Sequence, residues 1–239
     1  MVYLYQAIFY RPILNVLIYF YQTIAFHDFG LAIIFVTILL RLVLFPLFHK
    51  SSKHQMMMQR LQPKVKKIQE LHKDNREKQA QALSELYKEH GVNPFLSFVL
   101  LIIQLPVMLA LYWVVRSGLG SGQLIGLYAF VQAPQHINPL FLGHINLAVT
   151  SILLLALAAL AQYFQAKLAL YRDPNNKSEL SPAEKIGRNM VYVGPLMTLV
   201  VFYTLPAAVD LYWLVTSLFS IFQQILINRH FRRGETSAV

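Results

Sequence analysis

The sequence predicts an all-α integral membrane protein with five transmembrane helices, an N-terminal interfacial helix and a cytoplasmic helical hairpin. Hydrophobic residues make up 56% of the 239 residues and charged residues only 13%, which is too apolar for an ordinary soluble domain. The apolar residues gather in five runs, each about long enough to cross a bilayer as a helix. The cations gather between these runs, as expected of loops outside the membrane.

The first 26 residues predict an external helix at the membrane interface. They are rich in Tyr and Phe but also contain Arg11, Pro12 and Asn15, a mixture typical of the headgroup region. We expect the helix to run from about residue 12 to residue 24. Alternatively, residues 12–26 belong to a spanning segment, but ~15 residues are short for ~30 Å of hydrocarbon. Asp28 is well placed to cap the helix that follows.

The first predicted span, 29–48, contains one charged residue, Arg41. A guanidinium stays charged in proteins and costs at least ~2.5 kcal/mol at mid-membrane, so Arg41 requires water, a partner or a cavity. Pro46 lacks the N–H that would bond the Leu42 carbonyl, and it predicts a bend about one turn from the arginine. The simpler interpretation of Arg41 is a hydrogen bond to a neighbouring helix.

Residues 50–93 predict a hairpin of two helices in water. This segment holds ten Lys/Arg and five Asp/Glu, with apolar residues at helical spacing on both sides of Asp74 and Asn75. Gly91 would end the second helix and Pro94 would return the chain to the membrane. The hairpin is either a solvated structure or a docking arm for a partner or for lipid headgroups.

The rest of the chain alternates apolar runs with polar or turn-rich segments. Small residues in the third run favour close helix packing, and Pro206 marks a turn between the last two. After the hairpin we expect a span at 96–115, an external loop at 117–146, a span at 147–164, a cytoplasmic loop at 167–188, spans at 189–205 and 209–227, and a tail at 228–239.

The distribution of cations predicts the orientation. Eighteen of the 21 Lys/Arg lie in the hairpin, in 167–188 and in the tail. By the positive-inside rule these segments are cytoplasmic, so the N-terminus is outside and the C-terminus inside. The formal charge of +10 therefore reflects topology and does not require nucleic acid. The chain has no cysteine, which excludes disulfides and thiolate metal sites.

Four motifs resemble one family. They are Thr37-x3-Arg41-x4-Pro46-Leu47, Tyr87-Lys88-x2-Gly91-Val92-Asn93-Pro94, Gln104-Leu105-Pro106-x3-Ala110-Leu111-Tyr112-Trp113, and Leu205-Pro206-Ala207-x3-Leu211-Tyr212-Trp213 with Gln223-Gln224. Each is weak alone, but their order and spacing are similar to the five-span core of the YidC-type membrane protein insertases of bacteria, mitochondria and chloroplasts. The resemblance covers residues 25 to 228, within a predicted core of 27–239.

The resemblance implies a hydrophilic groove, open to the cytoplasm and the inner leaflet, with Arg41 as its central cation. Thr37, Gln104 and Trp213 match other groove positions of the family. The implied function is that of an insertase and chaperone, which moves hydrophobic segments of new proteins into the bilayer of a bacterial inner membrane. Nascent membrane proteins and membrane lipid are then the expected partners, with the ribosome and a Sec-type translocon as further candidates, and no cofactor is implied.

Other interpretations remain open at this stage. Gln104 is equally well explained as an interhelical hydrogen-bonding residue. Asp210 is less typical of the family and is interpreted as a helix cap or an interfacial acid. The alternative functions are a small anion-selective transporter and a structural subunit of a larger translocon. An enzyme is not predicted, because the spans contain no paired acids, the chain contains no HExxH or GxSG motif, and His136 and His144 lack neighbouring ligands for a metal.

Overall fold

The structure is a computed structural model that describes residues 2–93, 95–121, 124, 126–170 and 182–236. These residues are mostly helical. The elements are α1 (Val2–Tyr5), the π-helix η1 (Gln6–Tyr10), α2 (Arg11–Thr23), α3 (Phe29–Val43), α4 (Phe45–Leu71), α5 (Arg76–Glu89), α6 (Leu96–Ser121), β1 (Leu140–Phe141), β2 (Ile145–Asn146), α7 (Ile152–Ala169), α8 (Pro182–Phe202) and α9 (Ala207–Thr236).

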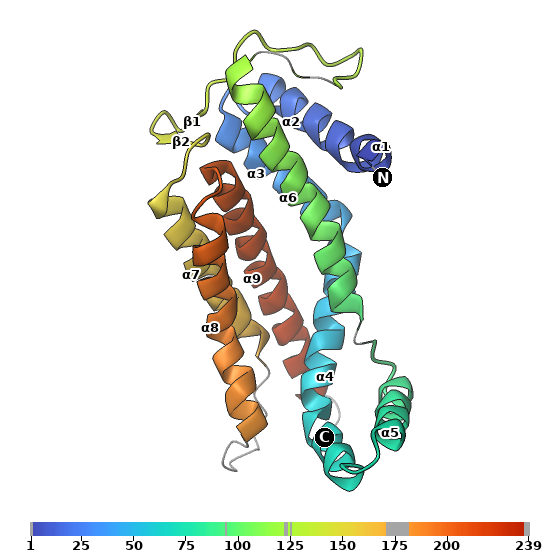
Figure 1. The fold of residues 1–239 in the computed structure, drawn as a ribbon. Coiled ribbons are helices and arrows are strands. Elements are labelled where there is room, and N and C mark those ends of the chain that lie inside the picture. Colours follow the sequence, from blue (N-terminus) through green and yellow to red (C-terminus); the bar gives the residue numbers. More distant parts are fainter. Residues whose placement is uncertain (1, 94, 122–123, 125, 171–181, 237–239) are drawn as a thin grey trace.

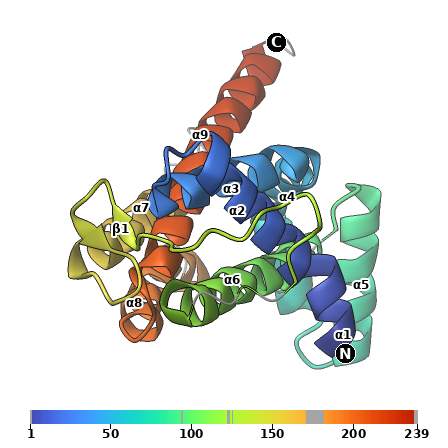
Figure 2. The ribbon, with the colours of Figure 1, turned by 90° about the horizontal axis from the view of Figure 1, so that it is seen from above.

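The long helices form an elongated bundle (Figure 1). Helices α7, α8 and α9 pack together, α3 and α6 lie on the other side of α9, and α2 crosses the end of the bundle that carries β1 and β2. Figure 2 shows this end from above, with the chain that leads to β1 lying over α2 and α6. Helices α4 and α5 project from the opposite end, where the C-terminus also lies, whereas the N-terminus lies at the α2 end.

The main core joins α2, α3, α6 and the start of α9. Leu14, Leu17 and Ile18 of α2 are fully buried against Phe29 and Ile33 of α3 and their neighbours. The apolar residues of α2 recur at helical spacing, so one face of this helix can be buried completely. The N-terminal helix is therefore part of the core rather than a loosely attached segment.

The N-terminal helix begins ten residues earlier than predicted, because η1 allows the helix to continue past Pro12. A proline inside a helix lacks one donor and crowds the carbonyl four residues earlier. Here the Arg11 N–H bonds the Gln6 carbonyl, a π-type turn that widens the helix just before the proline. The chain from Val2 to Thr23 is consequently helical throughout.

Asn15 of α2 holds the segment that follows α6. Its side chain is 2% exposed; Nδ2 donates to the Gly126 carbonyl at 3.1 Å, and Oδ1 accepts from the Tyr128 N–H at 2.6 Å. Further along α2, Gln22 donates to the Gln132 carbonyl at 2.8 Å. The loop after α6 is thus fixed to the N-terminal helix by side-chain bonds to its backbone.

We expect Asn15→Ala to destabilise the protein by about 1–3 kcal/mol, because it removes a buried side chain that makes two part-buried hydrogen bonds to the loop backbone. Thermal unfolding of the purified protein in detergent would measure the loss, and amides at 126–131 should exchange faster. Gln22→Ala is the matched control, since its bond is exposed to solvent and its loss should cost less. Equal effects of the two changes would contradict this role of Asn15.

The first predicted span is bent at Leu44. Helix α3 starts at Asp28, whose Oδ1 accepts from the Leu31 N–H at 2.9 Å, so the predicted cap is confirmed. The bend expected from Pro46 is present: α3 and α4 meet at 67°, and the Leu44 N–H bonds the carbonyls of Leu40 and Leu42. Helix α4 begins at Phe45 and continues past the predicted end of the span at residue 48, into the polar segment to Leu71.

Helices α4 and α5 lie side by side, joined by a turn at 72–75. A small apolar cluster of Leu61, Val65, Leu86 and Val92 holds them together. The side chain of Asn75 caps α5 by accepting from the Lys78 N–H at 2.9 Å. Most of the other residues of the pair are at least partly exposed, as their many charges predict.

The segment before α7 contains a two-stranded hairpin that was not predicted. Phe141 of β1 lies over Gly30 of α3 so closely that a Cβ on Gly30 would be 2.1 Å from the ring. Asp28 also accepts from the Leu142 N–H at 2.6 Å, which fixes the hairpin to the start of α3. Gly30 is therefore required for close approach of the hairpin.

Several helix boundaries differ from the predicted ones. Helix α6 extends to Ser121, past Arg116. Helix α7 begins at residue 152 instead of 147, because the Leu147 N–H bonds the Pro139 carbonyl and the carbonyls of Leu147 and Val149 accept from the start of α9. Helix α8 starts at residue 182 and α9 runs to residue 236. Of the predicted loops and tail, residues 122–123, 125, 171–181 and 237–239 lie outside the described residues, as does Pro94.

Among the described residues, α7 and Ala207–Arg229 of α9 are long and apolar enough to cross a membrane. The bent pair α3 and α4 adds a third if it is counted as one span, and Ile102–Arg116 and Val191–Phe202 are shorter apolar helical stretches. Large apolar side chains are exposed on the outer faces of these helices, including Ile102 of α6, Ile152 of α7 and Val200 of α8. Such a surface is expected of helices in contact with lipid.

Candidate functional site

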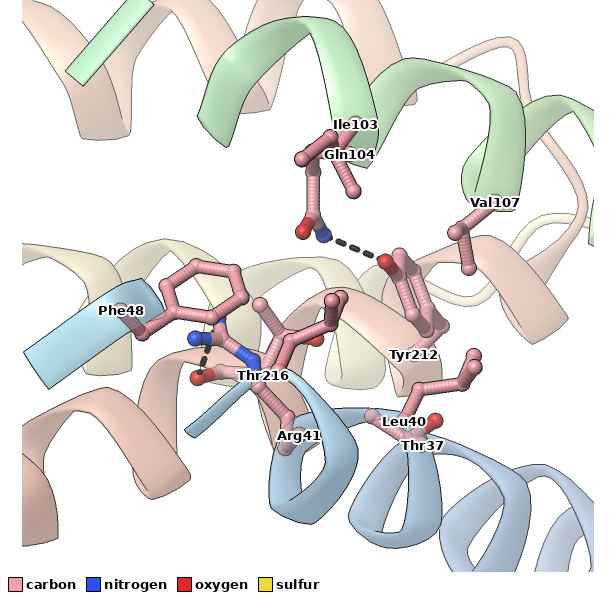
Figure 3. A pocket seen from close by; sticks show the side chains of 10 residues that line it. Thr37, Leu40, Arg41, Phe48, Ile103, Gln104, Val107, Tyr212 and Thr216 are labelled. Atoms are coloured by element: carbon pink, nitrogen blue, oxygen red, sulfur yellow. Dashed lines mark hydrogen bonds between the residues drawn. The ribbon is translucent and has the colours of Figure 1, made fainter. Parts of the chain in front are cut away.

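Four helices enclose a small cavity around Arg41 (Figure 3). Its walls come from α3, α4, α6 and α9, together with Leu44 at the bend. The residues that line it are Thr37, Leu40, Arg41, Leu44, Phe48, Ile103, Gln104, Val107, Tyr212 and Thr216. The cavity volume is about 10 Å³, roughly the space that one water requires. The space beside Arg41 is therefore too small to hold a peptide segment.

Arg41 is 5% exposed and only partly satisfied. Its Nη2 donates to the Thr216 carbonyl at 3.1 Å, and its Cζ lies 4.1 Å from the centre of the Phe48 ring. The Nη1 atom is buried and has no hydrogen-bond partner among the described residues. Within the same part of the chain, no carboxylate is within ion-pair distance of Arg41. A buried cation with an unused donor is suited to bind an acceptor or an anion that enters the cavity.

Thr37 and Gln104 also lie in this cavity, but both use their donors within the protein. The Thr37 hydroxyl, 1% exposed, donates to the Ile33 carbonyl at 2.6 Å. Gln104 Nε2 donates to the Tyr212 hydroxyl and thereby connects α6 to α9 (Figure 3). The structure thus shows the interhelical bond that the sequence left open for Gln104.

Trp213 does not line the cavity, whereas its neighbour Tyr212 does. Consecutive residues on a helix point ~100° apart, and Trp213 faces Phe202 of α8, with the two rings 5.1 Å apart. It packs against the main core and also against a second apolar cluster that contains Leu155 and Val209.

Sequence reasoning missed Tyr212 and Thr216, which face the cavity from α9. Their spacing of four residues places both on one side of the helix, and Ser220 continues the same stripe. The Ser220 hydroxyl donates to the Thr216 carbonyl at 3.0 Å. A polar stripe at this spacing in an otherwise apolar helix was the signal that could have identified them.

Two further polar side chains of α9 lie outside the cavity. Asp210 is 1% exposed in the first turn of the helix, and the structure gives it no bond to Arg41. Its Oδ1 has no hydrogen-bond partner among the residues that the structure describes. Gln223 donates to the Phe45 carbonyl at 3.3 Å, which connects α9 to the start of α4.

Comparisons of this chain with known proteins all match one protein family. The family model described as "60Kd inner membrane protein" matches residues 19–234. Proteins named membrane protein insertase YidC, from Francisella tularensis subsp. novicida (strain U112) and subsp. tularensis (strain SCHU S4 / Schu 4), are each 30% identical over 209 residues, which is 86% of this chain and 33% of theirs. The chain therefore spans about a third of the length of these relatives.

A solved structure is also similar. It is described as an active YidC insertase crystal structure with the first transmembrane domain resolved, and it superposes with a TM-score of 0.59 at 27% sequence identity. The match covers 89% of this chain and 45% of the other. Both the sequence and the arrangement of helices are thus similar to those of insertases.

Proposed function

Because the chain belongs to the 60Kd inner membrane protein family, we propose that it is a membrane protein insertase that moves hydrophobic segments of new proteins into the bilayer past Arg41. The observation that carries this proposal is the buried Arg41, which is held between four helices and whose Nη1 has no hydrogen-bond partner among the described residues. A polar position inside an apolar bundle shortens the dry path that the polar tail of a client must cross. No bond has to be made or broken for this activity.

Transport of a segment requires the site to open, because a cavity of about 10 Å³ cannot hold a peptide. Between α6 and α9, the Gln104–Tyr212 hydrogen bond is a polar contact that separation of these helices would break. Such a hydrogen bond contributes only about 1 kcal/mol net to stability. Polar groups of a client segment can replace it. We infer that α6 moves away from α3 and α9 when a client enters.

The proposed topology has five spans: α3 with the start of α4, α6, α7, α8 and α9, with the N-terminus outside the cell membrane and the C-terminus in the cytoplasm. The cation distribution supports this orientation, as do the opposite positions of the two termini in Figure 1. Helices α4 and α5 then form a cytoplasmic hairpin. Nascent membrane proteins are the proposed substrates, and the ribosome and a Sec-type translocon are proposed partners.

This topology predicts opposite labelling of two single cysteines introduced into the cysteine-free chain. Ser84 of α5 and Ala133 in the loop after α6 are both exposed. An impermeant maleimide added to intact cells should label Ala133→Cys, and it should label Ser84→Cys only after the membrane is opened. Labelling of both positions from the same side would contradict the five-span arrangement.

Reconstitution of the purified protein alone into liposomes tests the proposed function. A one-span client should insert, as measured by protease protection, and the rate should depend on the amount of reconstituted protein. The unpartnered donor of Arg41 also fits an anion-selective transporter, so anion flux is measured in the same vesicles. Anion flux without client insertion would contradict the insertase function and support the anion-selective transporter.

A further inference from the structure

A second, larger cavity lies between α4 and the connection from α5 to α6. Its volume is about 530 Å³, within the range of small-molecule sites. Lys50, Lys53 and His54 line it from α4, and Gly91 and Asn93 line it from the connection. Among the described residues that line this cavity, none is acidic.

The basic side chains make the cavity electropositive. Partial burial and the two neighbouring ammonium groups, Lys50 and Lys53, lower the pKa of His54. The Asn93 N–H donates to His54 Nδ1 at 3.2 Å, so a neutral ring carries its proton on Nε2 as a hydrogen-bond donor. The lining of the cavity thus includes two lysine side chains and a ring N–H donor, and Lys50, Lys53 and His54 all come from α4.

The backbone keeps one wall of the cavity open. Gly91 has φ +61°, and a Cβ at this position would meet no atom within 4 Å. The positive φ follows from the end of α5, where glycine is the usual residue. A larger residue here would be strained and would also extend into the open space.

The position of the cavity points to the membrane surface. Leu96, which also lines the cavity, is the first residue of α6 and begins its apolar run, while Lys50 and Lys53 belong to the polar part of α4. In Figure 1 the start of α6 lies beside α4 at this level. The cavity therefore combines basic side chains with an apolar wall, provided by Met57 and Leu96.

We propose that this cavity binds a phosphate group, supplied by the headgroup of an anionic phospholipid in the cytoplasmic leaflet. Lysines at a cytoplasmic membrane surface attract anionic lipids, and basic pockets beside spanning helices bind their headgroups. The bound lipid would join α4 to the start of α6 and so stabilise their relative position. This inference goes beyond the proposed insertase activity and rests only on the topology proposed above.

The test measures retention of phosphatidylglycerol and phosphatidylcholine by the full-length protein with native mass spectrometry. We expect one phosphatidylglycerol to bind at least about tenfold more tightly than phosphatidylcholine. The double variant Lys50→Gln with Lys53→Gln should lose about tenfold in this affinity. The matched control, Lys67→Gln with Lys73→Gln, removes two exposed cations outside the cavity and should change it less than about twofold.

Equal weakening in both double variants would overturn the proposal, since it would mean a diffuse effect of charge. The absence of any preference for phosphatidylglycerol would overturn it too. Competition with inorganic phosphate distinguishes a lipid headgroup from a free phosphate ion as the ligand. If millimolar phosphate does not displace the lipid, the lipid headgroup is supported as the ligand. If it does displace the lipid, the proposal is overturned and the ligand is a free anion. Thermal unfolding confirms that each variant is folded, as expected for changes at exposed lysines.

Discussion

Replacing Arg41 with alanine is expected to reduce insertion of clients with acidic external tails by at least about tenfold, because a cation in a site of low dielectric attracts an anion by several kcal/mol more than in water. Insertion into liposomes, with protease protection of the tail, is the measurement. Clients with uncharged tails should be affected less, since they lose no charge interaction. The same comparison with Arg41→Lys should show that much of the activity remains, although lysine lacks the planar fork of arginine.

The protein should remain folded without Arg41. The Thr216 carbonyl keeps the Ser220 hydroxyl as a partner, and the unpartnered Nη1 disappears together with its buried charge. Burying a charge without an ion-pair partner costs desolvation energy, and the alanine variant does not bear this cost. Normal insertion of acidic-tailed clients by Arg41→Ala would disprove the role of the charge, and unfolding of this variant in detergent would make Arg41 a structural residue.

Cross-linking α3 to α6 across the cavity is expected to abolish most insertion. Leu40 and Ile103 line opposite walls of a space no larger than one water, so cysteines at these positions are within reach of a short bis-maleimide. If α6 has to move for a client to enter, the cross-linked protein should lose at least about tenfold in rate, which corresponds to about 1.4 kcal/mol or more in the barrier. The same variant without cross-linker should remain active.

A second pair of cysteines, between α7 and α8, controls for effects of the cross-linking reaction itself. Gln162 and Thr198 are hydrogen-bonded to each other, so cysteines there are also within reach of the cross-linker, and neither residue lines the cavity. Cross-linking this pair should change the rate less than about twofold, because helices that stay packed lose nothing when joined. Insertion at the normal rate by the cross-linked Leu40–Ile103 variant would show that the site works without opening.

The general course of the chain could be predicted because apolar runs and polar segments are separated cleanly in the sequence. The cap at Asp28 and the bend near Pro46 follow from local chemistry, and the structure confirms both. The start of α7 could not be predicted in the same way. Leu147 and Val149 are apolar enough for a helix, but their backbone groups bond Pro139 and the start of α9. Contacts between distant segments decide such boundaries.

The candidate site could be predicted only in part, because some of its residues follow from local sequence and others depend on how the helices pack. Arg41 could be recognised as a candidate because it is the only charged residue in an apolar run. Thr37 could be placed beside it because residues four apart lie on the same face of a helix. The face that α9 turns toward Arg41 depends on how the helix packs, so Trp213 and Tyr212 could not be told apart from a motif that contains both. The β1–β2 hairpin has strands of only two residues, which are too short to give a periodic signal.

The break at Leu44 makes α4 a lever. Its 27 residues extend ~40 Å from the bend, so a tilt of ~10° at Leu44 carries the far end through ~7 Å while α3 stays in place. Phe48 lies in the first turn of this lever and covers the Arg41 guanidinium. A load applied near Leu71 would reach the ring that shields the buried charge as far as α4 stays straight past Pro63, the proline inside this helix. Displacement of Phe48 would open the Arg41 guanidinium to water and anions.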